Sequence, residues 1–271
     1  MLPRSLQYVS VPLRRLVMQH RARRRMAEMN HPVIIYQMAK VGSRSVEQAL
    51  ERAGCDSVHI HYLFDLEEKM VRHIEQRVPI PDHFWTSGAL RRQWTDRPRR
   101  IITLVRDPVA RFISGCFHSP ELLGLDLSTR EQAQEEVERL SCRPGAFDYP
   151  QRWFSEELQR ATGIDAMAHS FDAAQGFARI ATDRFEVLVL QTEQLQTLLP
   201  GVVSDFVGRP LQAVTTGVRA DAMYQTVKQA FYIPSDILDT VYGSPFAAHF
   251  YTAAQRERFR QRWSQDRSVP A

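Results

Sequence analysis

Residues 33–45 decide the fold, and they read VIIYQMAKVGSRS. The first four are β-branched or aromatic residues, which predict a short buried strand. Glycine and serine then predict a loop, and the apolar spacing from Val46 to Ala53 predicts a helix that ends at Gly54. A strand, a loop and a helix in this order direct the unpaired N–H groups of the first helical turn toward a ligand. This is the backbone geometry that binds anions.

The same alternation of strand and helix continues along the chain. We predict further strands at residues 58–61, 100–105 and 186–190. Helices are expected at 65–77, from Pro108, from Ser128 to about Leu140, from Pro234–Ser235, and at 252–263. Strands that alternate with helices predict an α/β fold with a largely parallel sheet. We expect a basic N-terminal arm or helix over 1–30 and a single α/β domain over 31–271.

The positive charge of the chain is concentrated at its N-terminal end. The 271 residues carry 35 Lys and Arg and 31 Asp and Glu, a formal net charge of +4. Residues 1–30 hold seven arginines and one acid, Glu28, so the rest of the chain is slightly acidic. A body that coats nucleic acid would carry its own excess of cations, so the composition argues against a nucleic-acid partner.

The basic arm allows two structural interpretations. We favour a helix that packs its Leu13, Leu16 and Val17 stripe on the body of the protein. Because the arm is rich in arginine and poor in acids, a membrane-surface helix or a transit peptide stays open as the alternative. Contact with a membrane or a polyanion through residues 1–30 is therefore the partner expected besides a substrate.

Cysteine usage and hydropathy indicate a cytoplasmic location. Cys55, Cys116 and Cys142 are odd in number, widely spaced and without a CxxC pair, which favours reduced thiols over a disulfide framework. No stretch approaches the ~18 apolar residues that span a bilayer. We expect a cytoplasmic protein, with the inner face of the membrane as the alternative site.

Residues 39–45 carry the chemistry of an anion site. Gly42 lets the backbone approach a ligand, Ser43 and Ser45 add hydroxyl donors, and Lys40 adds a point charge. A Walker loop would place Lys directly after Gly, and the chain contains no Gly-Lys pair. On these residues alone, nucleotide binding and an ordinary strand–helix turn both stay open.

Residues 106–114, RDPVARFIS, provide a second candidate anion element. Arg106 ends a predicted strand, and Ser114 lies about two turns into the next helix. The planar fork of arginine matches the oxygens of a phosphate group. An Arg106–Asp107 pair that staples the start of the helix is the structural alternative.

The order of Lys40, Gly42 and Ser43 resembles the sulfate-donor loop of the sulfotransferase superfamily. Residues 36–43, YQMAKVGS, are similar to the opening of the bacterial capsular polysaccharide synthesis family, a branch of those enzymes. The resemblance implies a P-loop-like three-layer sandwich and transfer of a sulfuryl group from 3′-phosphoadenosine 5′-phosphosulfate (PAPS) to a hydroxyl. It also implies a carbohydrate as the acceptor and no metal requirement.

The resemblance further implies how the donor is held. Lys40, Ser43, Ser45 and the amides from Gly42 onward would hold the 5′-phosphosulfate, and Arg106 and Ser114 would clamp the 3′-phosphate. Two residues depart from the family pattern, because Ala39 stands where Pro or Gly is usual and Arg44 replaces a small hydroxyl residue. Arg44 either contacts the donor or points to solvent.

Two histidines are candidates for the base that removes the acceptor proton. His59 and His61 are two residues apart and would face the same side of a strand. The superfamily commonly carries its catalytic histidine between the two donor elements, so we take His61 as the base and His59 as its assistant. That one of them, His59 above all, is a buried strand histidine bonded to backbone stays open. One His-x-His pair without a third ligand argues against a metal site.

Some features keep other interpretations open. His249 resembles a C-terminal signature of the capsular branch, for which acceptor binding and core packing are both open. A row of arginines predicts a solvated loop, with an access path for an anionic sugar as the alternative: Arg91, Arg92, Arg97, Arg99 and Arg100. Two functions of other classes remain, a P-loop-type kinase or NTPase and a non-catalytic protein that binds a membrane or polyanion.

Overall fold

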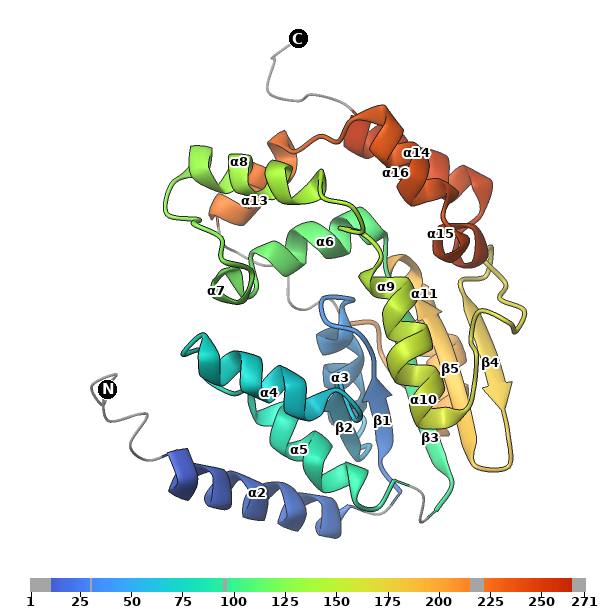
Figure 1. Cartoon of the computed structure of the whole chain (residues 1–271). Coiled ribbons are helices and arrows are strands. Elements are labelled where there is room, and N and C mark those ends of the chain that lie inside the picture. Colours follow the sequence, from blue (N-terminus) through green and yellow to red (C-terminus); the bar gives the residue numbers. More distant parts are fainter. Residues whose placement is uncertain (1–10, 30, 95–96, 215–221, 265–271) are drawn as a thin grey trace.

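The computed structural model describes residues 11–29, 31–94, 97–214 and 222–264. Its centre is a five-stranded sheet with the strand order β2-β1-β3-β5-β4 (Figure 1). The strands are β1 (Val33–Tyr36), β2 (Ser57–Ile60), β3 (Arg99–Val105), β4 (Phe177–Ala181) and β5 (Phe185–Gln191). All neighbouring strands run parallel except β4, which pairs antiparallel with β5. The predicted α/β class with a mostly parallel sheet is confirmed.

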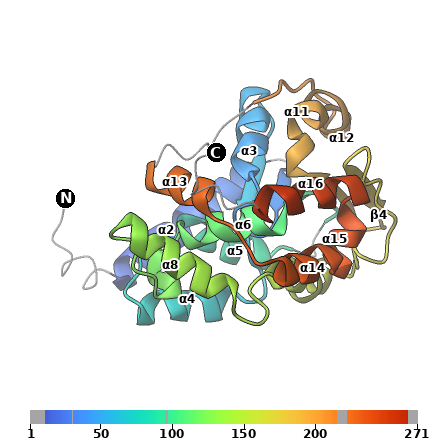
Figure 2. The same cartoon turned by 90° about the horizontal axis from the view of Figure 1, so that it is seen from above.

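Helices flank the sheet on both faces. Seen from above, α3 (Ser43–Arg52), α11 (Leu195–Leu198) and α12 (Ser204–Val207) lie on one side, and α4 (Leu66–Glu75) and α5 (Asp82–Arg91) lie on the other (Figure 2). Before the sheet comes α2 (Val11–Glu28). The middle of the chain forms α6 (Pro108–Cys116), α7 (Pro120–Leu123), α8 (Arg130–Ser141), α9 (Tyr149–Arg152), the π-helix η1 (Trp153–Leu158) and α10 (Gln159–Thr162). The C-terminal part adds η2 (Thr192–Gln194), η3 (Leu199–Val203), α13 (Ala222–Ala230), α14 (Ser235–Gly243), α15 (Pro245–Phe250) and α16 (Ala253–Ser264).

The four predicted strands are found to within one residue at each end. The predicted helices are also found, with one shift at the capping box: the N-cap of α8 is Thr129, whose Oγ1 accepts from the backbone N–H of Gln132 at 3.2 Å. Among the elements that were not predicted are the helix α5 and the strand β4.

The apolar side chains form two cores. One surrounds the sheet, and its centre is the fully buried run of β1 together with Ile101 and Ile102 of β3. The other lies among α6, α8, α13, α14 and α16, around the buried Trp263. The second core covers the carboxyl ends of the strands, at the top of the view in Figure 1.

The N-terminal helix α2 packs on α5 with a different face from the predicted one. Ala22 and Met26 are 7% and 2% exposed and belong to the core around the sheet. Leu16 and Val17, in contrast, are 63% and 42% exposed. The predicted packing of the Leu13, Leu16 and Val17 stripe is therefore wrong for Leu16 and Val17, because the spacing of Ala22 and Met26 places those two residues on the far side of the helix. The side chain of Leu13 lies outside the described residues, as do residues 1–10 of the predicted arm.

The predicted solvated arginine loop is also wrong. Arg99 is a buried residue of β3 whose guanidinium donates to the carbonyl of Gln93, and Arg100 donates to the carbonyl of Phe206 at 3.1 Å. Arg91 ends α5, where it pairs with Glu67. The arginines therefore lie on different elements and not in one loop.

Two smaller findings concern the described part of the chain. None of its helices combines the length and the apolarity needed to cross a lipid bilayer. Cys55, Cys116 and Cys142 are free thiols.

Candidate functional site

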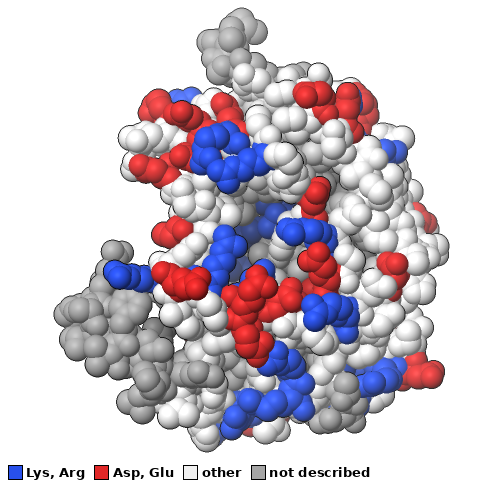
Figure 3. Space-filling model, viewed as in Figure 1, with Lys and Arg blue, Asp and Glu red and all other residues white. Residues whose placement is uncertain are grey.

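The predicted site residues lie along one edge of the sheet, where its parallel strands end. Lys40 follows β1, His61 follows β2, Arg106 follows β3 and Glu193 follows β5. The chain moves from β1 outward to β2, whereas β3 lies on the opposite side of β1. Lys40 and Arg106 thus border the point where the strand order reverses, which is where open α/β sheets bind ligands. Figure 3 shows a hollow in this face of the molecule, with Lys and Arg side chains in and around it.

The loop after β1 adopts an unusual backbone conformation. Gly42 precedes α3 with φ +84°, and Lys40 has φ +73°, a conformation that costs about 1–2 kcal/mol for a residue with a side chain. A Cβ at Gly42 would lie 2.9 Å from Cγ2 of Thr192, so glycine is also needed for packing. The hydroxyl of Thr192 donates to the carbonyl of Val41. A strained backbone of this kind persists only where surrounding contacts hold it. Here the contacts come from Thr192, which follows β5, and from Arg106, which follows β3.

The element after β3 holds this loop directly. Nη1 of Arg106 donates to the carbonyl of Lys40 at 2.8 Å, and Nε of Arg111 donates to the carbonyl of Ala39 at 3.3 Å. The two predicted anion elements are therefore in contact. Two guanidinium groups bring their positive charge to the loop that precedes the N-terminus of α3.

The serines of the loop lie in the first turn of α3. Ser43 and Ser45 are each only 8% exposed, whereas Arg44 between them is exposed. Ser114, two turns into α6, is also 8% exposed, and within the described residues no hydrogen bond joins it to Arg106.

Asp107 links the Arg106 element to the C-terminal helices. Its Oδ1 accepts from Tyr242 Oη at 2.8 Å and from Val109 N at 3.0 Å, and its Oδ2 accepts from Trp263 Nε1 at 2.8 Å. Burial raises the pKa of Asp107 despite these three donors. The structural alternative, an Arg106–Asp107 pair that holds the start of the helix, is thus replaced by another role. Asp107 caps α6 and holds α14 and α16 above the site.

Arg111 was not predicted as a site residue. Its guanidinium lies 4.1 Å from the centre of the Tyr149 ring, and Tyr149 and Tyr62 share a hydrogen bond of 2.7 Å between their hydroxyls. Burial lowers the pKa of Arg111. A cation–π contact in a partly desolvated place keeps this cation next to Ala39 and contributes about 1–2 kcal/mol.

The hydrogen bonds of the two histidines define their tautomers. Nδ1 of His61 lies 2.8 Å from the carbonyl of Gln37 and must donate to it, so Nε2 of a neutral His61 carries a lone pair. The side-chain amide of Gln37 lies 3.1 Å from Nε2 of His59, and Nδ1 of His59 faces the carboxylate of Glu47 at 3.6 Å. The backbone-bonded histidine is therefore His61, and His59 is bonded to side chains.

His61 lies between two other imidazoles. Its ring centre is 4.8 Å from that of His59 and 4.7 Å from that of His83, both in edge-on contacts. Burial lowers the pKa of His61 well below 6.5, and the positive charge that His59 and His83 can carry lowers it further. Burial also lowers the pKa of His83, to about 4. His61 is neutral at physiological pH, the form that can accept a proton.

Glu193 also lies at the carboxyl edge of the sheet, directly after β5. Its Oε1 accepts from the backbone N–H of Asp107 at 2.8 Å, and its Oε2 accepts from Tyr251 Oη at 3.3 Å. Desolvation, and to a smaller extent the negative charge of the nearby Asp107, raises the pKa of Glu193 to about 7, although the residue is exposed to solvent. A partly protonated carboxyl reduces the repulsion that an anion would meet here.

The loop after His61 is fixed by η1. The buried carboxylate of Glu157 accepts from Tyr36 Oη at 2.6 Å, from Phe64 N at 3.0 Å and also from Leu63 N. Nε1 of Trp153 donates to the carbonyl of His61 at 3.0 Å. These bonds hold the backbone of His61 between the end of β2 and η1.

His249 does not join these residues. Its ring packs on Phe250 at 4.6 Å and on Phe171 at 6.2 Å between ring centres, which favours the core-packing interpretation. Among the residues that the structure describes, no group of three or more His, Cys, Asp or Glu is arranged to hold a metal ion.

Part of the amino-acid sequence matches a known protein family. The family described as "Putative capsular polysaccharide synthesis protein" matches residues 148–252, which is less than half of the chain. Over that segment the chain is similar to a capsular polysaccharide synthesis family. Searches of curated proteins and of solved structures find no significant match.

The matched segment surrounds the candidate site. It contains residues that contact each of the three predicted elements: Tyr149 beside Arg111, Trp153 against the His61 carbonyl, Thr192 against the Lys40 loop, and Glu193 and Tyr242 around Asp107. The part of the chain that resembles the capsular family is thus the part that supports the site.

Sequence reasoning missed several of these residues, and the reasons differ. Glu193 could have been found, because it directly follows a predicted parallel strand, at the edge where such sheets bind ligands. Arg111 also had a signal, since it lies one helical turn after Asp107 in the predicted helix. Gln37, His83 and Glu157 had none, because their roles arise from contacts between distant elements.

Proposed function

We propose that the protein is a sulfotransferase, which transfers a sulfuryl group from PAPS to a hydroxyl of a carbohydrate. The contact between Arg106 and the Lys40 carbonyl carries this proposal, because it joins two anion-binding elements at the strand-order reversal. A donor with a 5′-phosphosulfate and a 3′-phosphate needs two such elements within the length of one nucleotide. The carbohydrate acceptor rests on the resemblance of residues 148–252 to the capsular family.

The residues present fit a phosphate-rich ligand. No side chain of the described residues caps the N-terminus of α3, the hydroxyl residues Ser43 and Ser45 lie in its first turn, and a helix N-terminus favours negative charge. Arg106 can grip a phosphate group through the donors that it does not use on Lys40. The raised pKa of Glu193 lowers the negative charge of a carboxyl group at the same edge of the sheet.

Each residue then has a role in the proposed reaction. The donor supplies the sulfuryl group and leaves as adenosine 3′,5′-bisphosphate. Nε2 of His61 accepts the proton of the attacking hydroxyl as the new oxygen–sulfur bond forms. The Lys40 ammonium and the α3 amides stabilise the negative charge that develops on the bridging oxygen as the old bond breaks. His59 and Gln37 orient the His61 ring and contact no substrate.

Calorimetric titration with adenosine 3′,5′-bisphosphate tests the proposal, with adenosine 5′-monophosphate and ATP measured beside it. The proposal predicts that the bisphosphate binds more tightly than either by a factor of at least ~10, the value of one charge-assisted phosphate contact. Tighter binding of ATP together with magnesium-dependent turnover would replace the proposal by a kinase or NTPase. Equal binding of bisphosphate and monophosphate would remove the 3′-phosphate clamp.

A further inference from the structure

The helix α2 has a second face whose described side chains are exposed to solvent. Its inner face, with Ala22 and Met26, packs on α5. Leu16 and Val17 are exposed. Arg21 follows Val17 by four residues, about one helical turn, and Arg23 and Arg24 follow Leu16 and Val17 by seven, about two turns, so these exposed side chains lie on the outer half of the helix. This outer face is apolar toward the N-terminus of the helix and basic toward its C-terminus.

The cations of this face are available for a partner. Arg21 and Arg23 are exposed, and neither has an ion pair among the described residues. Arg24 pairs with Glu28 at 2.8 Å, and Arg25 adds to the positive potential at Glu47 on α3. Lys and Arg side chains also gather along the lower edge of the face in Figure 3, the part of the molecule where α2 lies.

An anionic lipid surface matches both halves of this face. A soluble polyanion such as a nucleic acid or a sulfated polysaccharide would satisfy the arginines but would leave Leu16 and Val17 in water. A lipid interface satisfies both, because apolar side chains enter the acyl boundary while arginines face the phosphate groups. The excess of positive charge in residues 1–30 adds to this attraction.

We propose that α2 docks the protein on a membrane that contains anionic lipid, with Leu16 and Val17 in the interface and Arg21 and Arg23 at the headgroups. This surface is connected to the candidate site, because α2 packs on α5 and the ring of His83 on α5 lies 4.7 Å from the ring of His61. Because α2 lies at the bottom of the view in Figure 1 and the carboxyl ends of the strands lie at the top, docking would leave the carboxyl edge of the sheet facing away from the membrane. The inference does not depend on the proposed reaction.

Vesicle flotation of the full chain tests the proposal. Vesicles of phosphatidylcholine alone are compared with vesicles that also contain phosphatidylglycerol, at low and high salt. We expect binding only to the anionic vesicles and weaker binding at high salt. The double replacement Arg21→Gln and Arg23→Gln should lower the partition coefficient about 25-fold. Each arginine near an anionic surface raises the affinity about five-fold, and the two factors multiply.

The apolar half is tested by Leu16→Ser together with Val17→Ser. This pair should lower binding on the order of 5-fold while the salt dependence stays that of the native chain. Since both side chains are exposed, the substitutions should leave the unfolding midpoint unchanged. Deletion of residues 1–30 is a poorer test, because Ala22 and Met26 belong to the core.

Matched controls come from the opposite end of the molecule. Arg143→Gln with Arg258→Gln removes two exposed arginines from other elements, and Leu123→Ser with Tyr232→Ser removes two exposed apolar side chains. Neither control should change vesicle binding. Equal binding to neutral and anionic vesicles would overturn the proposal, as would loss of binding in the arginine control. Tight binding to dextran sulfate, with vesicle binding unaffected by the Leu16 and Val17 substitutions, would assign the face to soluble polyanions and would equally overturn it.

Discussion

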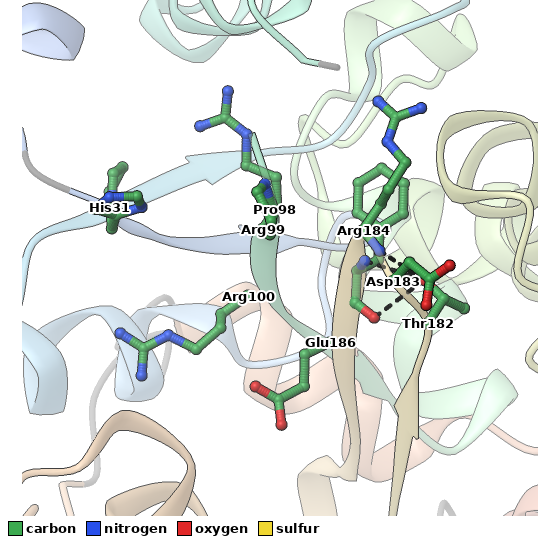
Figure 4. Close-up of a pocket in the computed structure, with 10 residues that line it drawn as sticks. His31, Pro98, Arg99, Arg100, Thr182, Asp183, Arg184 and Glu186 are labelled. Carbon is green, nitrogen blue, oxygen red and sulfur yellow. Dashed lines mark hydrogen bonds between the residues drawn. The ribbon is translucent and has the colours of Figure 1, made fainter. Parts of the chain in front are cut away.

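The two edges of the sheet are both rich in arginine, yet they differ in how the cations are arranged. At the carboxyl edge, Arg106 and Arg111 both donate to consecutive carbonyls of one loop. At the amino edge, a cavity of about 340 Å³ is lined by Arg99, Arg100 and Arg184. In Figure 4, Arg99 and Arg184 extend to one side of this edge, whereas Arg100 extends to the other.

The amino-edge cavity also holds acids. Asp183 and Glu186 line it, and Glu186 forms an ion pair with Arg179. Arg99 and Arg100 are bonded to backbone carbonyls of the neighbouring chain segments. The two edges therefore differ in that two cations converge on one loop only at the carboxyl edge, where we propose the anion site.

The largest expected effect is at His61. His61→Gln should lower the sulfuryl-transfer rate by about 10²–10⁴-fold, because the acceptor proton loses its base. In the native protein the acidic limb of the rate profile should lie below pH 6.5, since the pKa of His61 is lowered and its neutral form persists to lower pH. The measurement is the pH dependence of kcat/KM. An acidic limb that is the same in His61→Gln and in the native chain would exclude His61 as the base.

Lys40→Ala should have the next largest effect. The rate should fall by about 10²–10³-fold if the ammonium stabilises charge in the transition state, while donor affinity changes less. Arg184→Ala at the amino edge is the matched control, and its turnover should equal that of the native chain. The comparison between the edges fails if the Arg184 variant loses as much activity as the Lys40 variant.

Arg106→Ala should act mainly on binding. The affinity for adenosine 3′,5′-bisphosphate should fall about 10- to 100-fold, the value of a charge-assisted bond to phosphate, and the affinity for the 5′-monophosphate should change less. Arg106→Lys should restore only part of the affinity, because an ammonium cannot provide the planar fork. The measurement is the dissociation constant of each nucleotide by calorimetry. An equal loss of affinity for both nucleotides would contradict a specific contact between Arg106 and the 3′-phosphate.

The smallest expected effect concerns stability. Because the pKa of His83 is about 4 in the folded chain and near 6.5 when unfolded, the unfolded state binds its proton first as the pH falls. The free energy of unfolding should therefore decrease from pH 6.5 to pH 4, with His83 responsible for about 2 kcal/mol after allowance for its partial exposure. His83→Gln should reduce this decrease, and His20→Gln, a change at an exposed histidine of α2, serves as the control. An unchanged decrease in the His83 variant would contradict the desolvation of this ring.

The sequence predicted the parallel strands because β1, β3 and β5 are compact apolar runs and β2 alternates apolar and polar residues. It did not predict β4, in which only Ile180 is buried, because an edge strand with exposed neighbours carries no apolar run. The helix α5 was missed because Thr, Ser and Gly interrupt the apolar residues of its sequence. Propensity and periodicity report local burial, so elements that are defined by tertiary contacts escape them.

The candidate site was predictable to a similar degree. Lys40, His61 and Arg106 were expected at strand ends, and the structure places them on one edge of the sheet. Their supporting residues came from far along the chain: Glu157 is 94 residues from Leu63, whose N–H it accepts, and Thr192 is 151 residues from Val41. Such partners are set by how the helices pack over the sheet, and no local pattern encodes that packing.

The most direct test of the central claim is a crystal structure of the protein with adenosine 3′,5′-bisphosphate. The account predicts the 5′-phosphate at the N-terminus of α3, near Lys40, and the 3′-phosphate in contact with Arg106. A nucleotide bound in the amino-edge cavity, or one held by the Lys40 loop with its 3′-phosphate in solvent, would contradict it.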